Sequence, residues 1–388
     1  MNVLFICPFN LGKTDIKTVA TYKRLINLAK LFQVSGANVT IACVTTKAEE
    51  DYYADSIHYR FISLKALEVY RRRLASIFYT DLIVKYLMQK GETFLAVCIY
   101  GGYFTAGFPL LRARKKNHFK LGYVINDWYQ LKSPSLLGKI NILLGRNLVY
   151  PRFSFAIVVS RWLEKRCSRA CRTLLIPALM EDQVFDDVNG LHEKRSSKTS
   201  IAYAGNIADK DIMRNAIWAL QYLSPEQRER IELHFYGSLP EGLFRKIEGG
   251  DTDIPKTYKS TVFFHGFMPQ QQLRAELSSM DYTMFFRPDK PYSRAGFANK
   301  FAESLSMSIP VITNITGDMG AYLHDSEEGI VAKSEHPKDI AAAFKRALSI
   351  GTLEHANMRK KAYETARESF QIASYIETTR AFLKALEV

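Results

Sequence analysis

The stretch RAGFANKFAESLSMSIPVITN, Arg294–Asn314, decides the fold that this 388-residue sequence predicts. An Ala-Gly-Phe turn leads into a short amphipathic segment, in which Lys300 and Glu303 stand three residues apart, and then into an apolar run. Side chains at this spacing share one face of a helix. We therefore predict a helix that starts near Ala298 or Asn299, followed by a buried strand.

The same alternation of apolar runs and amphipathic segments continues along the whole chain. The first half contains NVLFIC, NVTIACV, FLAVCIYGG, KLGYVIND and FAIVVS, and the second half contains SIAYAG, IELHFYG, TVFFHG, DYTMFF and PVITN. Strands that alternate with helices predict parallel sheets covered on both faces. A polar stretch near residues 190–199 separates the two halves.

We therefore predict an α/β fold of two Rossmann-like, doubly wound domains that face a central cleft. The expected domains are residues 1–190 and 191–370, and residues 371–388 are expected to form a closing helix that returns to the first domain. The length and the 47% hydrophobic content fit two cores better than one.

No run of about 18 uncharged apolar residues occurs, and the N-terminal MNVLFICPFN lacks the basic region and cleavage site of a signal peptide. We expect a cytoplasmic protein. The cysteines are five in number and lack the spacing of a zinc site, so buried or free thiols are expected.

The positive charge is concentrated in the first half of the chain. Residues 1–190 hold 27 Lys and Arg against 14 Asp and Glu, a balance of 27 − 14 = +13, and the remainder holds 26 against 25, a balance of +1. Clusters lie at Arg71–Arg73, Arg112–Lys120 and Arg161–Arg172. This distribution indicates a polyanion or an anionic membrane surface as partner.

Two turns that follow predicted strands are candidate anion sites. In YAGNIADKD the strand ends at Gly205 and a helix is expected near Asp211, so backbone N–H groups and Lys210 could face a diphosphate. In PFNLGK, Gly12 would allow the backbone to approach a ligand closely. The alternative for the first is a plain strand-to-helix turn with a solvated lysine, and for the second a glycine that serves only the turn.

Several nucleotide-binding motifs are missing. Neither turn carries G-x-G-x-x-G followed by an acidic residue after the next strand, and no Walker motif occurs. The Asp251–Asp253 sequence lies in a Gly-rich polar loop, and we interpret it as solvated, so no metal site is predicted.

Four segments, RAGFANKFAESLSMSIPVITN, SIAYAGNIADKD, AIVVSRWLEKRC…LLIPALMED and KLGYVINDWYQ, together resemble bacterial glycosyltransferases of the GT-B fold, close to the retaining family 4 (glycosyl transferases group 1). The resemblance covers most of the chain in the family's order. It implies a nucleotide-sugar donor site in the second domain and an acceptor site in the first.

The resemblance also implies roles for single residues. Glu303 would bind the nucleotide ribose, and Lys210 and Lys300 would face the diphosphate, Lys210 with a catalytic role. With Gly12 and Gly205 from the two turns described above, the remaining donor-site candidates are Asn206, Arg287, Gly296, Phe297 and Ala298. The family's first glutamate falls on Ala295 here and a common arginine on Asn206, with Arg214 or Arg287 as candidate replacements.

Asp127, in VINDWYQ, is the candidate for acceptor binding or proton acceptance, with a helix cap or a loop carboxylate as the alternative. For Lys300 and Glu303 the alternative is an ion pair on a helix surface.

The predicted function is transfer of a sugar from a UDP- or GDP-sugar to a lipid-linked or oligosaccharide acceptor in bacterial surface polysaccharide synthesis. The enzyme would need no cofactor or metal, would retain the anomeric configuration, and would work at the inner face of the plasma membrane without nucleic acid as partner. The alternatives are a basic nucleic-acid-binding protein, a non-catalytic sugar-nucleotide-binding protein and a sugar-nucleotide epimerase.

Overall fold

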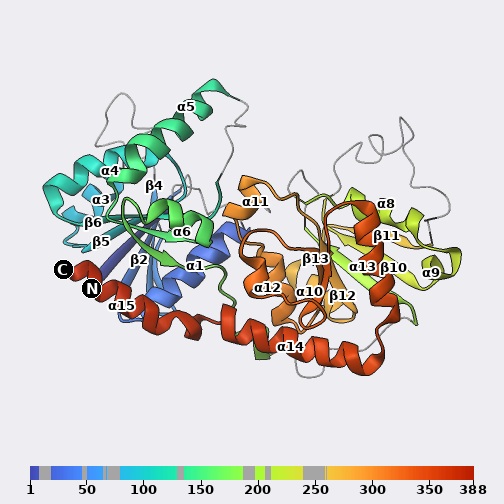
Figure 1. The fold of residues 1–388 in the computed structure, drawn as a ribbon. Helices are drawn as coiled ribbons and strands as arrows, with labels where there is room; N and C mark the ends of the chain where they lie inside the picture. The colour runs from blue at the N-terminus through green and yellow to red at the C-terminus, as the bar shows by residue number, and fades with distance from the viewer. Residues whose placement is uncertain are drawn as a thin grey trace. The chain divides into compact units, whose positions relative to one another are not determined.

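The computed structural model describes residues 1–7, 19–45, 50–63, 67, 79–128, 135–186, 197–205, 211–238, 258 and 260–388. These residues form two compact units, each built on one sheet with helices on its faces (Figure 1). The N-terminal unit consists of Met1–Leu179 and Ile372–Val388, and the C-terminal unit consists of Met180–Gln371.

The sheet of the N-terminal unit has eight strands in the order β3-β4-β2-β1-β5-β6-β7-β8. The strands are β1 Asn2–Cys7, β2 Asn38–Thr45, β3 Glu50–Ala54, β4 Ile57–Ser63, β5 Ala96–Tyr100, β6 Lys120–Ile125, β7 Phe155–Val158 and β8 Arg172–Leu175. All neighbouring pairs are parallel except β3 and β4, which pair in an antiparallel hairpin. Asp55 and Ser56 form its two-residue turn with positive φ angles of 50° and 61°.

The helices of this unit are α1 Val19–Val34, α3 Thr80–Gln89, α4 Phe104–Asn117, α5 Leu136–Leu144, α6 Arg161–Cys167 and α15 Ile376–Glu387. A π-helical turn, Gly145–Val149, follows α5. The C-terminal helix α15 packs against α1, and the ring of Phe382 lies 5.6 Å from that of Phe155. The end of the chain therefore completes the core of the unit in which the chain begins.

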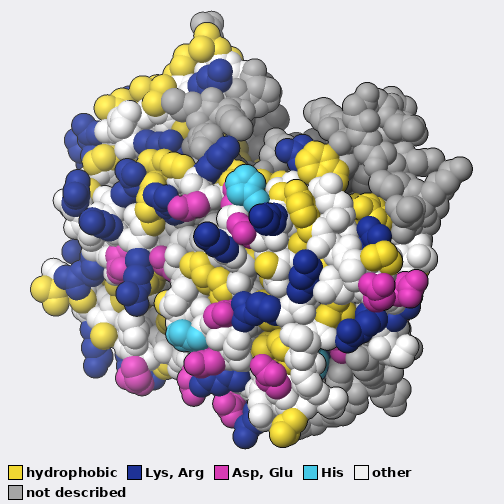
Figure 2. Space-filling view, turned by 45° about the vertical axis from the view of Figure 1, so that its right-hand side comes forward, with side chains coloured by type: hydrophobic (Ala, Val, Ile, Leu, Met, Phe, Trp, Pro, Cys, Tyr) yellow, Lys and Arg dark blue, Asp and Glu magenta, His cyan; other side chains and the backbone are white. Residues whose placement is uncertain are grey.

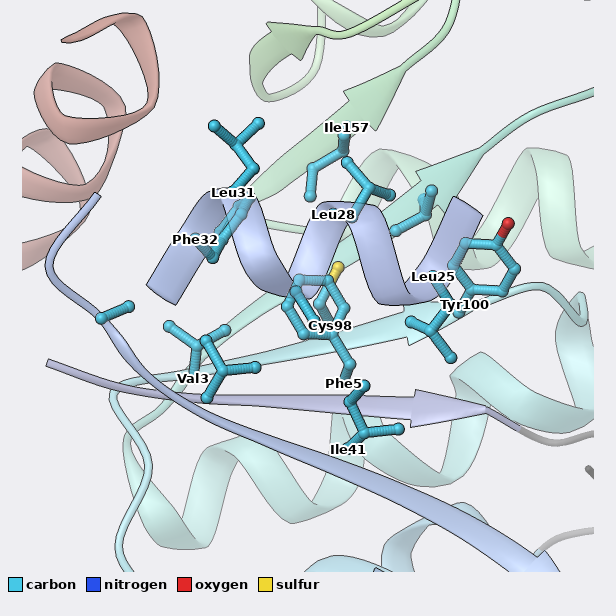
Figure 3. Close-up of a cluster of buried hydrophobic side chains, with 14 of the residues drawn as sticks. Val3, Phe5, Leu25, Leu28, Leu31, Phe32, Ile41, Cys98, Tyr100 and Ile157 are labelled. Carbon is cyan, nitrogen blue, oxygen red and sulfur yellow. The ribbon is translucent and has the colours of Figure 1, made fainter. Parts of the chain in front are cut away.

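The core of the N-terminal unit follows from the two-residue period of its strands. Every second residue of β1, including Val3 and Phe5, faces α1, whose Leu28 and Phe32 cover the strands (Figure 3). The rings of Phe5 and Phe32 meet edge to face at 5.3 Å. The intervening β1 residues are buried too, because the opposite face of the sheet is also covered.

The sheet of the C-terminal unit has six parallel strands in the order β11-β10-β9-β12-β13-β14. The strands are β9 Thr199–Ala204, β10 Ile231–Tyr236, β11 Val262–Gly266, β12 Tyr282–Phe285, β13 Val311–Asn314 and β14 Gly329–Ala332. The helices are α7 Asp182–Asp186, α8 Arg214–Ala219, α9 Pro225–Glu229, α10 Gln270–Ser278, α11 Pro291–Ala295, α12 Asn299–Ser306, α13 Pro337–Ser349 and α14 Thr352–Phe370.

The doubly wound α/β fold and the ten strands predicted from apolar runs are confirmed. Helix α12 begins at Asn299, where its sequence predicts it. The helix predicted near Asp211 is present as α8, but it begins three residues later, at Arg214. None of the helices in the described ranges is long and apolar enough to cross a bilayer.

Candidate functional site

The C-terminal unit has its topological switch point between β9 and β12. These strands are parallel neighbours, and the chain leaves β9 toward β10 on one side and β12 toward β13 on the other. Ligands of doubly wound sheets bind at the carboxyl ends of strands beside such a point. Gly205 follows β9 directly, and Arg287 comes two residues after β12.

A buried ionic cluster fills this position. The carboxylate of Asp211 accepts a hydrogen bond from Arg287 Nε at 2.6 Å and one from Lys300 Nζ. The hydroxyl of Tyr203 donates to the same carboxylate at 3.1 Å, and the Lys300 ammonium lies 4.2 Å from the centre of the Tyr203 ring. Side chains from β9, from the loop after β12 and from α12 therefore meet on one aspartate.

Burial and ion pairing oppose each other in this cluster. Burial alone would raise the pKa of Asp211, but the charges of Lys300 and Arg287 outweigh it and hold that pKa well below its usual range. Burial lowers the pKa of Lys300, and Asp211 counteracts part of this shift. Burial, followed by the Asp211 charge, raises the pKa of Tyr203 well above its usual value. The two cations and one anion leave a net charge of +1.

Hydrogen bonds to the backbone of Phe286 and Arg287 hold the cluster in place. Asn314, the last residue of β13, accepts from the backbone N–H of Arg287 at 3.0 Å and donates to its carbonyl at 2.7 Å. Ile212 N–H donates to the carbonyl of Phe286 at 2.8 Å. This bond and the turn of Asp211 toward Arg287 explain why α8 starts later than its sequence predicts.

Gly205 lies above the cluster in a conformation that favours glycine, with φ of +147°. A Cβ atom here would lie 3.0 Å from Lys300 Nζ. The adjoining Gly237 is equally constrained, since its Cβ would lie 2.1 Å from the carbonyl oxygen of Gly205. The two glycines thus let the ends of β9 and β10 approach each other closely, with Gly205 beside the Lys300 ammonium.

Lys300 is paired with Asp211 and not with Glu303. The alternative of an ion pair between Lys300 and Glu303 is therefore wrong. Glu303 is exposed, and among the described residues it takes part in no ion pair within 4.0 Å. A carboxylate in this position can accept hydrogen bonds from a ligand's hydroxyl groups.

The turn before α12 offers backbone groups. The first N–H groups of a helix have no intrahelical acceptors, and they carry the positive end of the helix dipole. Gly296 and Ala298 are buried, and the Phe297 ring packs on Phe370 at 5.6 Å and on Tyr322 at 5.7 Å. The half-buried Phe297 side chain therefore anchors the turn on these two rings.

In the N-terminal unit, Asp127 is half-buried two residues after β6. Its neighbour Asn126 accepts from Arg24 Nε at 2.7 Å, and Arg24 also donates to the Ile176 carbonyl at 2.6 Å. The other neighbour, Trp128, is covered by the Arg146 guanidinium at 3.9 Å from the ring centre. Both flanks of Asp127 are thereby fixed.

Several predicted residues lie outside the described residues, namely Gly12, Asn206, Lys210, Arg71–Arg73 and Asp251–Asp253. Arg214 is exposed at the start of α8, whereas the Arg287 guanidinium is nearly buried against Asp211. As candidate metal ligands, the described residues bring together His324, Glu327 and Glu328. Glu328 already accepts hydrogen bonds from His324 N–H and Thr365 Oγ1 at 2.8 Å each, so this group is structural.

Sequence reasoning missed three residues of the cluster: Asp211 as its anion, Tyr203 and Asn314. Tyr203 and Asn314 are polar residues at the ends of β9 and β13, and the carboxyl ends of parallel strands gather at one edge. That rule could have found Asn314 and Tyr203. It could not have given the pairing of Asp211 with two cations distant in sequence.

Comparison with known proteins indicates which family and which fold this chain resembles. Residues 198–349 match the family model described as glycosyl transferases group 1. No curated protein matches the chain. Among solved structures, HepE of Anabaena in complex with UDP and glucose superposes with a TM-score of 0.68 at 14% identity, over 99% of each chain.

Two further structures have similar scores. A glycosyltransferase of Rickettsia africae gives a TM-score of 0.70 at 12% identity, over 100% of this chain and 98% of its own. Sucrose-phosphate synthase of Thermosynechococcus elongatus gives 0.67 at 14% identity, over 100% and 99%. At these identities the likeness shows the fold, which is GT-B, and together with the family match it confirms the resemblance noted in the sequence.

Proposed function

We propose that this chain, which is a glycosyltransferase of the GT-B fold, transfers a sugar from a UDP-sugar to a lipid-linked saccharide acceptor in bacterial surface polysaccharide synthesis. The observation that carries the proposal is the cluster at the β9–β12 switch point. It unites a net positive charge with the N-terminus of α12 and the exposed Glu303.

The chemistry of the donor suits these groups. When the sugar leaves a nucleotide diphosphate, negative charge grows on the leaving oxygens, and preorganised N–H groups and ammonium groups stabilise it. In our proposal Lys210 and the turn Gly296–Ala298 contact the diphosphate and Glu303 contacts the ribose. Lys300 and Arg287, which Asp211 holds in place, supply a fixed positive electrostatic field behind these contact groups. Retention of configuration and independence from metal are part of the proposal.

The choice of UDP over GDP has separate support. HepE is known with UDP-glucose and the trehalose enzyme of E. coli with UDP-2-fluoro glucose, and both superpose over at least 99% of this chain, although at 15% and 10% identity. We propose that Asp127 lies at the acceptor. The net charge of +13 in residues 1–190 favours an enzyme that acts at an anionic membrane surface on the cytoplasmic side.

Replacing Glu303 with alanine is expected to raise the donor KM about 10- to 100-fold. A hydrogen bond to a charged group contributes about 1.5–3 kcal/mol. The fold should be unchanged, since Glu303 is exposed. Steady-state kinetics over a range of UDP-sugar concentrations measure the effect.

Glu368→Ala is the matched control, because Glu368 is also an exposed helical glutamate of the C-terminal unit and should leave the donor KM unchanged. Full activity of Glu303→Ala with unaltered donor KM would show that another group binds the ribose.

A further inference from the structure

Helix α5 presents apolar side chains to solvent. Leu136 and Leu137 are 73% and 79% exposed, and Ile140 and Leu143 are each 41% exposed. Positions i, i+1, i+4 and i+7 lie on one face of a helix. Ile142 points to the other side and is buried.

The outward orientation of this face is fixed by packing on α4. The backbone N–H of Thr105 donates to Asn141 Oδ1 at 3.0 Å. After α5, Val149 fits against Gly107 of α4, where a Cβ atom would lie 2.4 Å from Val149 Cγ1. The inner side of α5 and its π-helical extension are thus committed to α4, and the leucines face away. In the upper left of Figure 2, at about the height of α5 in Figure 1, hydrophobic side chains gather on the surface, with Lys and Arg side chains beside and below them.

The stretch of sequence that contains α4 and α5 carries almost only positive charges. Between Glu92 and Glu164 the sequence has Asp127 as its one acidic residue. The same segment contains ten basic residues, Arg112, Arg114, Lys115, Lys116, Lys120, Lys132, Lys139, Arg146, Arg152 and Arg161. Lys139 lies on α5 itself, and Arg114 Nη1 donates to the Arg152 carbonyl at 2.9 Å, which ties the basic end of α4 to the segment after α5.

An apolar helix face together with basic residues favours one binding partner over another. A second copy of the chain, joined by a two-fold axis, would bring two such basic surfaces together, and like charges oppose that contact. An anionic bilayer offers apolar interior for the leucines and phosphate groups for the cations. The nine residues of α5 and five of its extension are too few to cross a bilayer, which takes about 20.

We propose that α5 is an interfacial membrane helix, which inserts Leu136, Leu137, Ile140 and Leu143 between anionic lipids while α4 and Lys139 contact the headgroups. The inference rests on the proposed membrane-surface location of the enzyme. It does not depend on the identity of the donor sugar.

Flotation of the full-length protein with vesicles tests the proposal. Vesicles of phosphatidylcholine with phosphatidylglycerol are compared with phosphatidylcholine alone, at low and at high salt. We expect preference for the anionic vesicles, and residual binding at high salt, because salt screens the charges but not the burial of leucines. The double substitution Leu137→Ser with Ile140→Ser should reduce binding at least tenfold under both conditions.

Leu353→Ser is the matched control, because Leu353 is a 76% exposed leucine on α14 and should not change flotation. The single substitution Leu137→Glu provides a second variant, at a largely exposed position, with the same expected loss. Stabilisation of each variant by UDP-sugar shows that donor binding is intact, so loss of flotation is separable from failure of the proposed function.

Two results would overturn the inference. One is flotation of the α5 variants equal to that of the parent protein. The other is a parent protein that fails to bind anionic vesicles but forms oligomers, by sedimentation velocity, that the α5 substitutions dissociate. That second result would assign the face to a second copy of the chain.

Discussion

Substitution of Asp211 by asparagine is expected to lower the free energy of unfolding by about 3–5 kcal/mol, because it removes one partner of a buried ion pair and leaves the other uncompensated. Here two cations, Arg287 and Lys300, would lose their counter-charge in a largely buried site. Urea denaturation followed by circular dichroism measures the change.

Asp289→Asn is the control for this experiment. Asp289 accepts two hydrogen bonds from Arg294, at 2.7 and 2.6 Å, but both side chains are about half exposed. Its loss should cost about 1 kcal/mol or less. If the two substitutions lowered the free energy of unfolding equally, the Asp211 cluster would not stabilise the site more than a surface ion pair does.

The difference between the parent protein and Asp211→Asn should depend on pH. The pKa of Asp211 is lowered in the folded protein, so its contribution is present above the unfolded value of about 4 and is lost as the pH falls toward the folded value. The advantage of the parent protein is therefore expected to shrink below about pH 4.

Loss of the Lys210 ammonium is expected to raise the barrier of the chemical step by about 2.7–4 kcal/mol, the range for one preorganised oxyanion donor. This corresponds to a roughly 100- to 1,000-fold decrease in kcat. Lys210→Arg should restore part of the rate, since it keeps the charge but changes the geometry. Single-turnover kinetics of Lys210→Ala and Lys210→Arg with saturating donor measure both effects.

Lys338→Ala, an exposed lysine on α13, is the control and should leave kcat unchanged. Lys210 adjoins Asp211 in sequence but lies outside the described residues. If Lys210→Ala turned over within about threefold of the parent protein, the diphosphate charge would have to be met by other groups.

Much of the fold could be predicted because short stretches of sequence show the periodicity of their strands and helices. Apolar runs gave ten strands, and the spacing in KFAESLSM gave α12 within one residue. The β3–β4 hairpin was missed because neither strand has the continuous apolar run of a buried strand: β3 reads EDYYA, and β4, IHYRFIS, alternates apolar or aromatic residues with polar ones.

The site could be predicted only in part for a related reason. The stretch Arg294–Asn314 indicated Lys300 and Glu303 correctly as neighbours on α12, but the partner of Lys300 is set by tertiary contacts. Asp211 lies 89 residues earlier and meets Lys300 only because β9 ends, and α12 begins, at the same edge of the sheet. No local pattern contains that information.

The central claim, a nucleotide-sugar site in the C-terminal unit, is tested most directly by the thermal stability of the full-length protein with a panel of UDP- and GDP-sugars. A ligand at a hundredfold excess over its Kd stabilises the folded state by about 2.7 kcal/mol. We predict such a shift with at least one UDP-sugar, and its reduction in Glu303→Ala but not in Glu368→Ala. Stabilisation by an oligonucleotide and by none of the nucleotide sugars would contradict the account and favour a nucleic-acid-binding protein.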